Sequence, residues 1–141
     1  MVVCGIHFAA SEGRFVILES EQGEISHINV KTRRLLINND ENQDEIKAFR
    51  DTIFAFFREN HVQIVAIKKR NKKGDYAGGA ISFKLEAITQ LYDECPVNLI
   101  SPQTIKATLR KYSNPYPTTI YEYQKEAFEV AFTAIKTICH Q

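Results

Sequence analysis

The sequence predicts an α/β domain with a mixed five-stranded sheet covered by helices. Before residue 38, three runs rich in apolar and β-branched residues are separated by short glycine-bearing turns, which is typical of an antiparallel meander. After residue 38, apolar runs of strand length alternate with helical patterns, and this alternation favours parallel strands joined by crossover helices. The length of 141 residues suits one domain, so we expect a single domain over residues 1–141.

The strands are expected at residues 2–8, 14–19, 25–30, 62–67 and 97–100. Residues 35–37 either extend or follow the third strand. The run 62–67 is almost continuously apolar, as expected of a strand that is covered on both faces.

Helices are expected over residues 43–60, 81–92 and 102–109, with a last helix that ends near residue 138. Asn42 with Glu45, and Thr119 with Glu122, have the spacing of capping boxes. Ser101 followed by Pro102 is a strong helix start, because serine caps a helix and proline suits its first position.

This element order, β-β-β-α-β-α-β-α-α, is the topology of ribonuclease H-like domains. Enzymes with that fold place carboxylates on the first strand, near the end of the fourth strand and on the last helix, where they hold two divalent metals. Here the first strand carries His7 and no acid, and the fourth ends in Lys68, Lys69 and Arg70. Only the last helix offers carboxylates, so the sequence predicts no two-metal centre and no cofactor.

Four segments also resemble a bacterial domain-of-unknown-function family, number three thousand and ten, which is similar to Holliday-junction resolvases of the ribonuclease H fold. They lie at residues 3–6, 67–91, 101–106 and 123–128, and the most specific part is the glycine-bearing stretch 73–84. The resemblance implies the same fold over nearly the whole chain. It also implies that acidic residues commonly stand where this chain has His7 and Lys69. The family carries no established activity.

A basic loop follows the fourth strand and leads into a helix, an arrangement that can hold an anion. The residues expected to bind phosphate are Lys68, Lys69, Arg70, Lys72, Lys73, Gly78, Gly79 and Lys84. The alternative is a solvated surface loop whose glycines only permit a tight backbone path.

Two weaker candidates for a catalytic role are His7 and Glu126, as a general base or residual metal ligand. The alternatives are a hydrogen-bonded core histidine and a solvated helix position. Tyr112, Tyr116, Tyr121 and Tyr123 surround a proline-containing break and either pack onto the core or stack on unpaired bases.

Three functions compete. The first is a non-catalytic ribonuclease H-like domain that binds nucleic acid or another phosphate-bearing partner through the basic loop. The second is a nuclease that uses Mg²⁺ or Mn²⁺ and a displaced carboxylate set, drawn from Asp75, Glu86, Glu126 and Glu129. The third is a homodimeric interaction module, since Phe54 lies off the apolar stripe of its helix.

The overall charge balance is near neutral. Net charge is +1, with 44% hydrophobic and 25% charged residues, which excludes a globally basic coat protein. The three cysteines form no CxxC pair, and no apolar run reaches the roughly 20 residues that a membrane helix needs. We therefore expect a cytoplasmic protein with no membrane partner.

Overall fold

The computed structural model of the protein describes residues 1–72 and 79–138. Its strands form one mixed sheet in the order β3-β2-β1-β5-β6, with β4 paired to β2. These strands are β1 (Val2–Ala9), β2 (Glu12–Glu21), β3 (Glu24–Ile28), β4 (Arg34–Leu36), β5 (Ile64–Lys68) and β6 (Val97–Ile100). The first four pair antiparallel, and β5 and β6 are added in parallel to β1. The predicted α/β, ribonuclease H-like topology is confirmed.

The short strand β4 is a sixth strand, one more than the five expected. It pairs with residues 12–14 of β2, whereas β3 pairs with residues 17–21, so the two lie end to end along one edge of β2. The interruption between them is bridged by a hydrogen bond from the N–H of Phe15 to the carbonyl of Arg33, 2.8 Å long.

The helices are α1 (Gln43–Glu59), α2 (Ala80–Thr89), α3 (Pro102–Leu109) and α4 (Lys125–Thr137), with a 3₁₀ turn η1 (Glu122–Gln124) before α4. Asn42 and Ser101 cap α1 and α3 as expected, each accepting a backbone N–H three residues on. The expected cap at Thr119 is wrong. The chain instead turns at Tyr121, whose N–H donates to the Gln124 side chain, so the last helix begins later.

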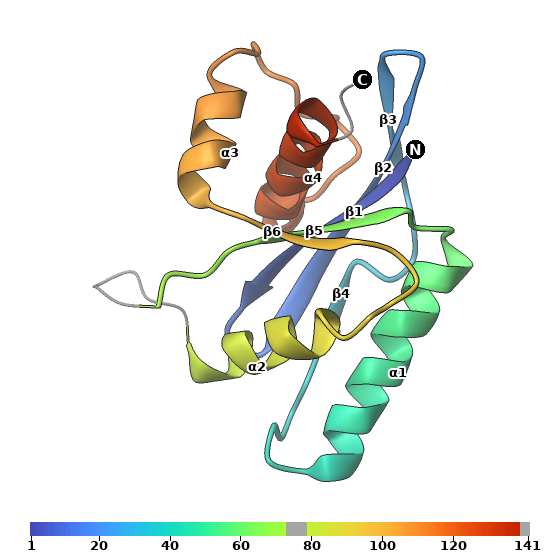
Figure 1. The fold of residues 1–141 in the computed structure, drawn as a ribbon, viewed down its shortest axis with the longest axis vertical. Helices are drawn as coiled ribbons and strands as arrows, with labels where there is room; N and C mark the ends of the chain where they lie inside the picture. Colours follow the sequence, from blue (N-terminus) through green and yellow to red (C-terminus); the bar gives the residue numbers. More distant parts are fainter. Residues whose placement is uncertain (73–78, 139–141) are drawn as a thin grey trace.

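Helices cover both faces of the sheet (Figure 1), with α1 and α2 on one side and α3 and α4 on the other. Because strand residues alternate between faces, Cys4, Ile6 and Phe8 of β1 join the core under α1 and α2. Val3 of β1 instead joins the core under α3 and α4, together with Ala66 of β5. In the described part of the chain, every helix is too short or too polar to cross a membrane.

Gly5 lets α4 lie directly on β1. A Cβ atom placed there would come 2.1 Å from the carbonyl oxygen of Ala127 and 2.7 Å from the Cβ of Ala131. No side chain fits into that space, so the helix backbone contacts the strand backbone. This contact fixes the position of the first turn of α4 over the C-terminal half of β1.

Candidate functional site at the end of strand β1

His7 and Lys68 lie side by side on the face of the sheet that α4 covers. His7 is two residues from Gly5 and therefore shares its face, since the side chains of a strand alternate. Lys68 follows Ile67, which pairs with Ile6 on the neighbouring parallel strand, just as His7 follows Ile6. The register thus places both polar side chains below the first turn of α4.

Glu126, in that first turn, contacts both of them. Its Oε1 accepts a hydrogen bond from the Nζ of Lys68, and its Oε2 lies 3.3 Å from the Nδ1 of His7. The His7 ring is not aligned for a hydrogen bond at this distance, and its Nδ1 has no other partner among the described residues. A carboxylate in the first turn is also stabilised by the helix dipole.

Arg70 contacts the other side of the imidazole, with its Nη1 3.4 Å from the Nε2 of His7. A guanidinium can only donate, so Nε2 must accept and the proton of the neutral ring must be on Nδ1, facing Glu126. Burial lowers the pKa of His7 to about 4, and the charges of Lys68, Arg70 and Arg14 add to this effect against the opposing effect of Glu126. The imidazole is therefore neutral at pH 7.

Glu126 is ionised in this setting. Burial alone would raise its pKa, but the hydrogen bond from Lys68 and the charges around it hold the pKa below the ordinary value of a glutamate. Its side chain keeps 43% of its surface exposed, whereas that of His7 keeps 6%. The cluster therefore presents one carboxylate, one neutral imidazole and the cations of Lys68 and Arg70.

These groups do not fit a divalent metal. One oxygen of the single carboxylate is bonded to an ammonium, the other faces an imidazole N–H, and a guanidinium lies behind the ring. Hard divalent ions need several oxygen ligands, and adjacent cations repel them. Over residues 1–72 and 79–138, no three His, Cys, Asp or Glu side chains gather as a metal site would require.

The other members of the displaced carboxylate set lie elsewhere, so that set is not assembled in the described residues. Glu129 accepts a hydrogen bond from the hydroxyl of Tyr116. Glu86 is buried on α2, on the opposite side of the sheet from α4, and burial raises its pKa despite the nearby cations of residues 69–72. Asp75 lies outside the described residues.

Apart from Lys68, which pairs with Glu126, the basic side chains predicted to bind an anion lie in different settings. Lys69 and Lys72 are exposed beside Arg70, and none of the three forms an ion pair with a described carboxylate. Lys84 is not part of this basic segment, because its Nζ donates to the carbonyl and carboxylate of Asp40. Lys73 and Gly78 lie outside the described residues.

Gly79, also predicted to bind an anion, is the N-cap of α2. The alternative, that a glycine is needed here for a tight backbone path, finds no support in its surroundings. Its φ of −71° is open to any residue, and a Cβ atom added to it would have no described atom within 4 Å.

Arg14 belongs to the same edge, although no local pattern in the sequence points to it. It pairs in register with His7 and contributes to the low pKa of the imidazole. Its Nε donates to Glu12 over 3.0 Å. Only the pairing of β1 with β2 brings Arg14 to this position, and the hairpin turn is the one sequence signal for that pairing.

Phe54, the basis for expecting a homodimer, packs within the chain. Its ring centroid lies 5.1 Å from that of Tyr92, and it is half-buried against the core under α1 and α2. Its place off the main helical stripe thus has an intramolecular cause.

Comparisons with known proteins agree with this topology. Two solved structures of RuvC from Thermus thermophilus are similar, one in complex with a Holliday junction substrate (14% identity, TM-score 0.64) and a second RuvC structure (11% identity, TM-score 0.68). In each case the likeness covers 94% of this chain and 92% of the other. The resolvase of Fowlpox virus, in a complex with substrate Holliday junction DNA, is also similar (13% identity, TM-score 0.58), over 99% of this chain and 100% of that one.

At these identities the structural likeness establishes the fold alone. No curated protein sequence matches the chain. A family described as "Protein of unknown function (DUF3010)" matches residues 1–134, so the chain belongs to this family.

Proposed function

We propose that this domain binds nucleic acid through the basic segment that follows β5, formed by Lys69, Arg70 and Lys72. We further propose that it does not cut the bound strand by a two-metal reaction. The observation that carries the proposal is the ammonium of Lys68 on Glu126. A positive side chain thereby occupies the position where a metal-dependent ribonuclease H-like enzyme needs a bound cation.

The charge around this pair favours phosphate. Lys69, Arg70 and Lys72 extend beyond the Lys68–Glu126 pair, and no described carboxylate neutralises them by an ion pair. Arginine and lysine side chains of this kind supply the sequence-independent part of nucleic-acid affinity.

The resolvase neighbours support a nucleic-acid partner by analogy. Two of the similar structures hold Holliday junction DNA, and those proteins share the fold over almost the full chain. Because fold does not fix function, the analogy favours nucleic acid as the class of partner but selects no particular substrate.

One experiment reads binding and cleavage together. Labelled single-stranded, duplex and four-way-junction DNA are incubated with the protein over a range of salt concentrations, with and without Mn²⁺, and run on native and denaturing gels. We expect binding whose logarithm falls linearly with the logarithm of salt concentration, and no cleavage. If three phosphates are contacted, the slope is about −3 on duplex DNA.

A charge-matched pair of variants locates the site. The triple variant Lys69→Ala, Arg70→Ala and Lys72→Ala should lower affinity at least tenfold and flatten the salt slope by up to about 3. The control removes the same charge from the exposed residues Lys106, Arg110 and Lys111 of α3 and the turn after it, and should leave the slope unchanged. Unaltered binding by the first variant, or equal losses in both, would contradict the proposed site, and Mn²⁺-dependent cleavage that Glu126→Gln abolishes would favour the nuclease.

A further inference from the structure

Two tyrosines and two arginines form a stack on the α4 side of the sheet. The rings of Tyr121 and Tyr123 are nearly parallel, at 10°, with centroids 5.7 Å apart. The guanidinium carbon of Arg33 lies 4.8 Å from the centroid of Tyr121, and that of Arg34 lies 4.5 Å from the centroid of Tyr123. We call these four residues the tyrosine–arginine stack.

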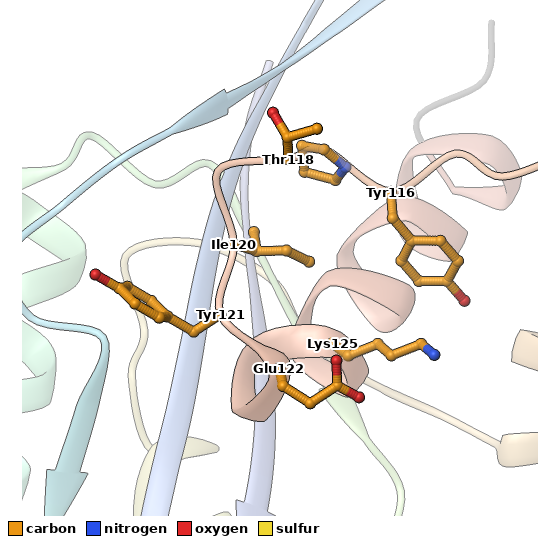
Figure 2. A pocket seen from close by; sticks show the side chains of 7 residues that line it. Tyr116, Thr118, Ile120, Tyr121, Glu122 and Lys125 are labelled. Atoms are coloured by element: carbon orange, nitrogen blue, oxygen red, sulfur yellow. The ribbon is translucent and has the colours of Figure 1, made fainter.

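The stack is open to solvent on one side, while Arg33 and Tyr123 are half-buried. Tyr121 is 53% exposed, and Arg34 is exposed beside it. Figure 2 shows the Tyr121 ring pointing away from Tyr116 and Lys125, which line the far side of a shallow pocket of about 260 Å³. The ring is thus one of the large side chains that the protein leaves exposed, in contact with Tyr123 and Arg33.

The strand register joins this stack to the site at the end of β1. Arg34 of β4 pairs with Arg14 of β2, and Arg14 pairs with His7 of β1. Paired residues lie on the same face, and Lys68 of β5 continues the row. This row of four side chains therefore crosses four neighbouring strands and spans about 14 Å at roughly 4.8 Å per strand step. Within it Arg14 is paired with Glu12 and Lys68 with Glu126, so the row gives the distance from the stack to the basic residues that follow β5.

We propose that the tyrosine–arginine stack is a platform for the unpaired bases of a strand whose phosphates are bound by Lys69, Arg70 and Lys72. This inference rests on the proposed nucleic-acid binding and narrows it to single-stranded segments. Planar aromatic and guanidinium groups stack on unpaired bases of any sequence. A duplex cannot use the platform, because its bases are already stacked on one another inside the helix.

The test compares one sequence of about 12 nucleotides in two forms, a labelled single strand and a blunt duplex, by fluorescence anisotropy. Tyr121→Ala should weaken single-strand binding on the order of tenfold, the effect of losing one stacked base, and should change duplex binding less than about twofold. Tyr121→Phe keeps the planar face and should bind both forms as the wild type does.

A second variant separates stacking from structural support. Tyr121→Leu keeps apolar bulk against Tyr123 and Arg33 but has no flat face, so it should lose single-strand affinity as Tyr121→Ala does while melting at the wild-type temperature. Wild-type single-strand affinity in Tyr121→Leu, or equal losses on both DNA forms, would overturn the platform and leave the proposed function standing. Failure of the wild-type protein to bind any nucleic acid would overturn both.

Discussion

The two ends of the contact between β1 and α4 differ sharply, although they lie only two residues apart along the strand. At Gly5 the backbones of strand and helix meet, and the neighbours are the small residues Ala127 and Ala131. At His7 the space between the same two elements is filled by polar and charged side chains, among them Glu126 and Lys68.

This difference separates two tasks. The Gly5 end fixes how close the helix lies to the strand, since a side chain at this position would force the two backbones apart. The His7 end determines the charge that the edge presents, through side chains that reach across the fixed space. Three variants test this division.

The largest effect is expected at the packed end. Gly5→Ala places a methyl group against the carbonyl oxygen of Ala127, so α4 must shift away from β1. We expect the free energy of unfolding to fall by about 3 kcal/mol, at the upper end of what overpacking costs, and urea denaturation followed by circular dichroism will measure it.

Gly79→Ala is the matched control for that variant. No described atom lies within 4 Å of the added methyl group, so the change costs only the poorer N-cap of α2, about 0.5 kcal/mol. Equal costs for the two variants would mean that the close approach at Gly5 is not what fixes the helix.

The second prediction concerns how the free energy of unfolding depends on pH through His7. The pKa of His7 falls from 6.5 to about 4 on folding, mainly by burial, so between these values the unfolded chain takes up a proton that the folded chain does not. The free energy of unfolding therefore decreases as the pH drops from 6.5 to 4, by up to about 3 kcal/mol from this group.

His7→Gln should remove most of this dependence. The variant and the wild type are compared by urea denaturation at several pH values across that window, because carboxylates elsewhere affect both proteins alike. His61→Asn, at an exposed position with a φ of 54° that asparagine tolerates, serves as the control and should keep the wild-type slope. A variant at position 7 that loses stability with acid as steeply as the wild type would refute the assignment.

The smallest effect is expected at Lys68. Lys68→Met removes the hydrogen-bond donor of Glu126, but the 43% exposure of that carboxylate lets water replace it. We therefore expect the free energy of unfolding to fall by about 1 kcal/mol near pH 7. Because the pKa of Glu126 lies below its ordinary value, this stabilisation should be lost as the pH falls through the folded pKa.

Lys84→Met is the comparison for this variant, since Lys84 pairs with Asp40 at the surface. It should cost less than about 0.5 kcal/mol. If both lysine variants lower the free energy of unfolding equally at every pH, the Lys68–Glu126 pair would contribute no more to stability than an ordinary surface ion pair.

The sequence predicted the topology because turns, apolar runs and helix starts are local signals. It did not distinguish Lys68 from Lys69 as the partner of Glu126. A strand buried on both faces shows no alternation of polarity, so nothing in the run 64–67 revealed which lysine would face α4.

The choice between Glu126 and Glu129 had the same difficulty. It depends on the rotation of α4 about its own axis, and the contact of Gly5 with Ala127 and Ala131 fixes that rotation. The tyrosine–arginine stack depends on a further long-range feature, the pairing of β4 with β2 that brings Arg34 beside Tyr123. These are properties of the assembled sheet, and no local pattern encodes them.

The backbone contact at Gly5 has a consequence for how such an edge can change. Because main-chain atoms set the spacing between strand and helix, the side chains at positions 7 and 68 can be exchanged without rebuilding the scaffold around them. An acidic version of this edge would differ from the basic version seen here by a few side chains on the same backbone. The charge of the edge can therefore change sign while the fold stays the same.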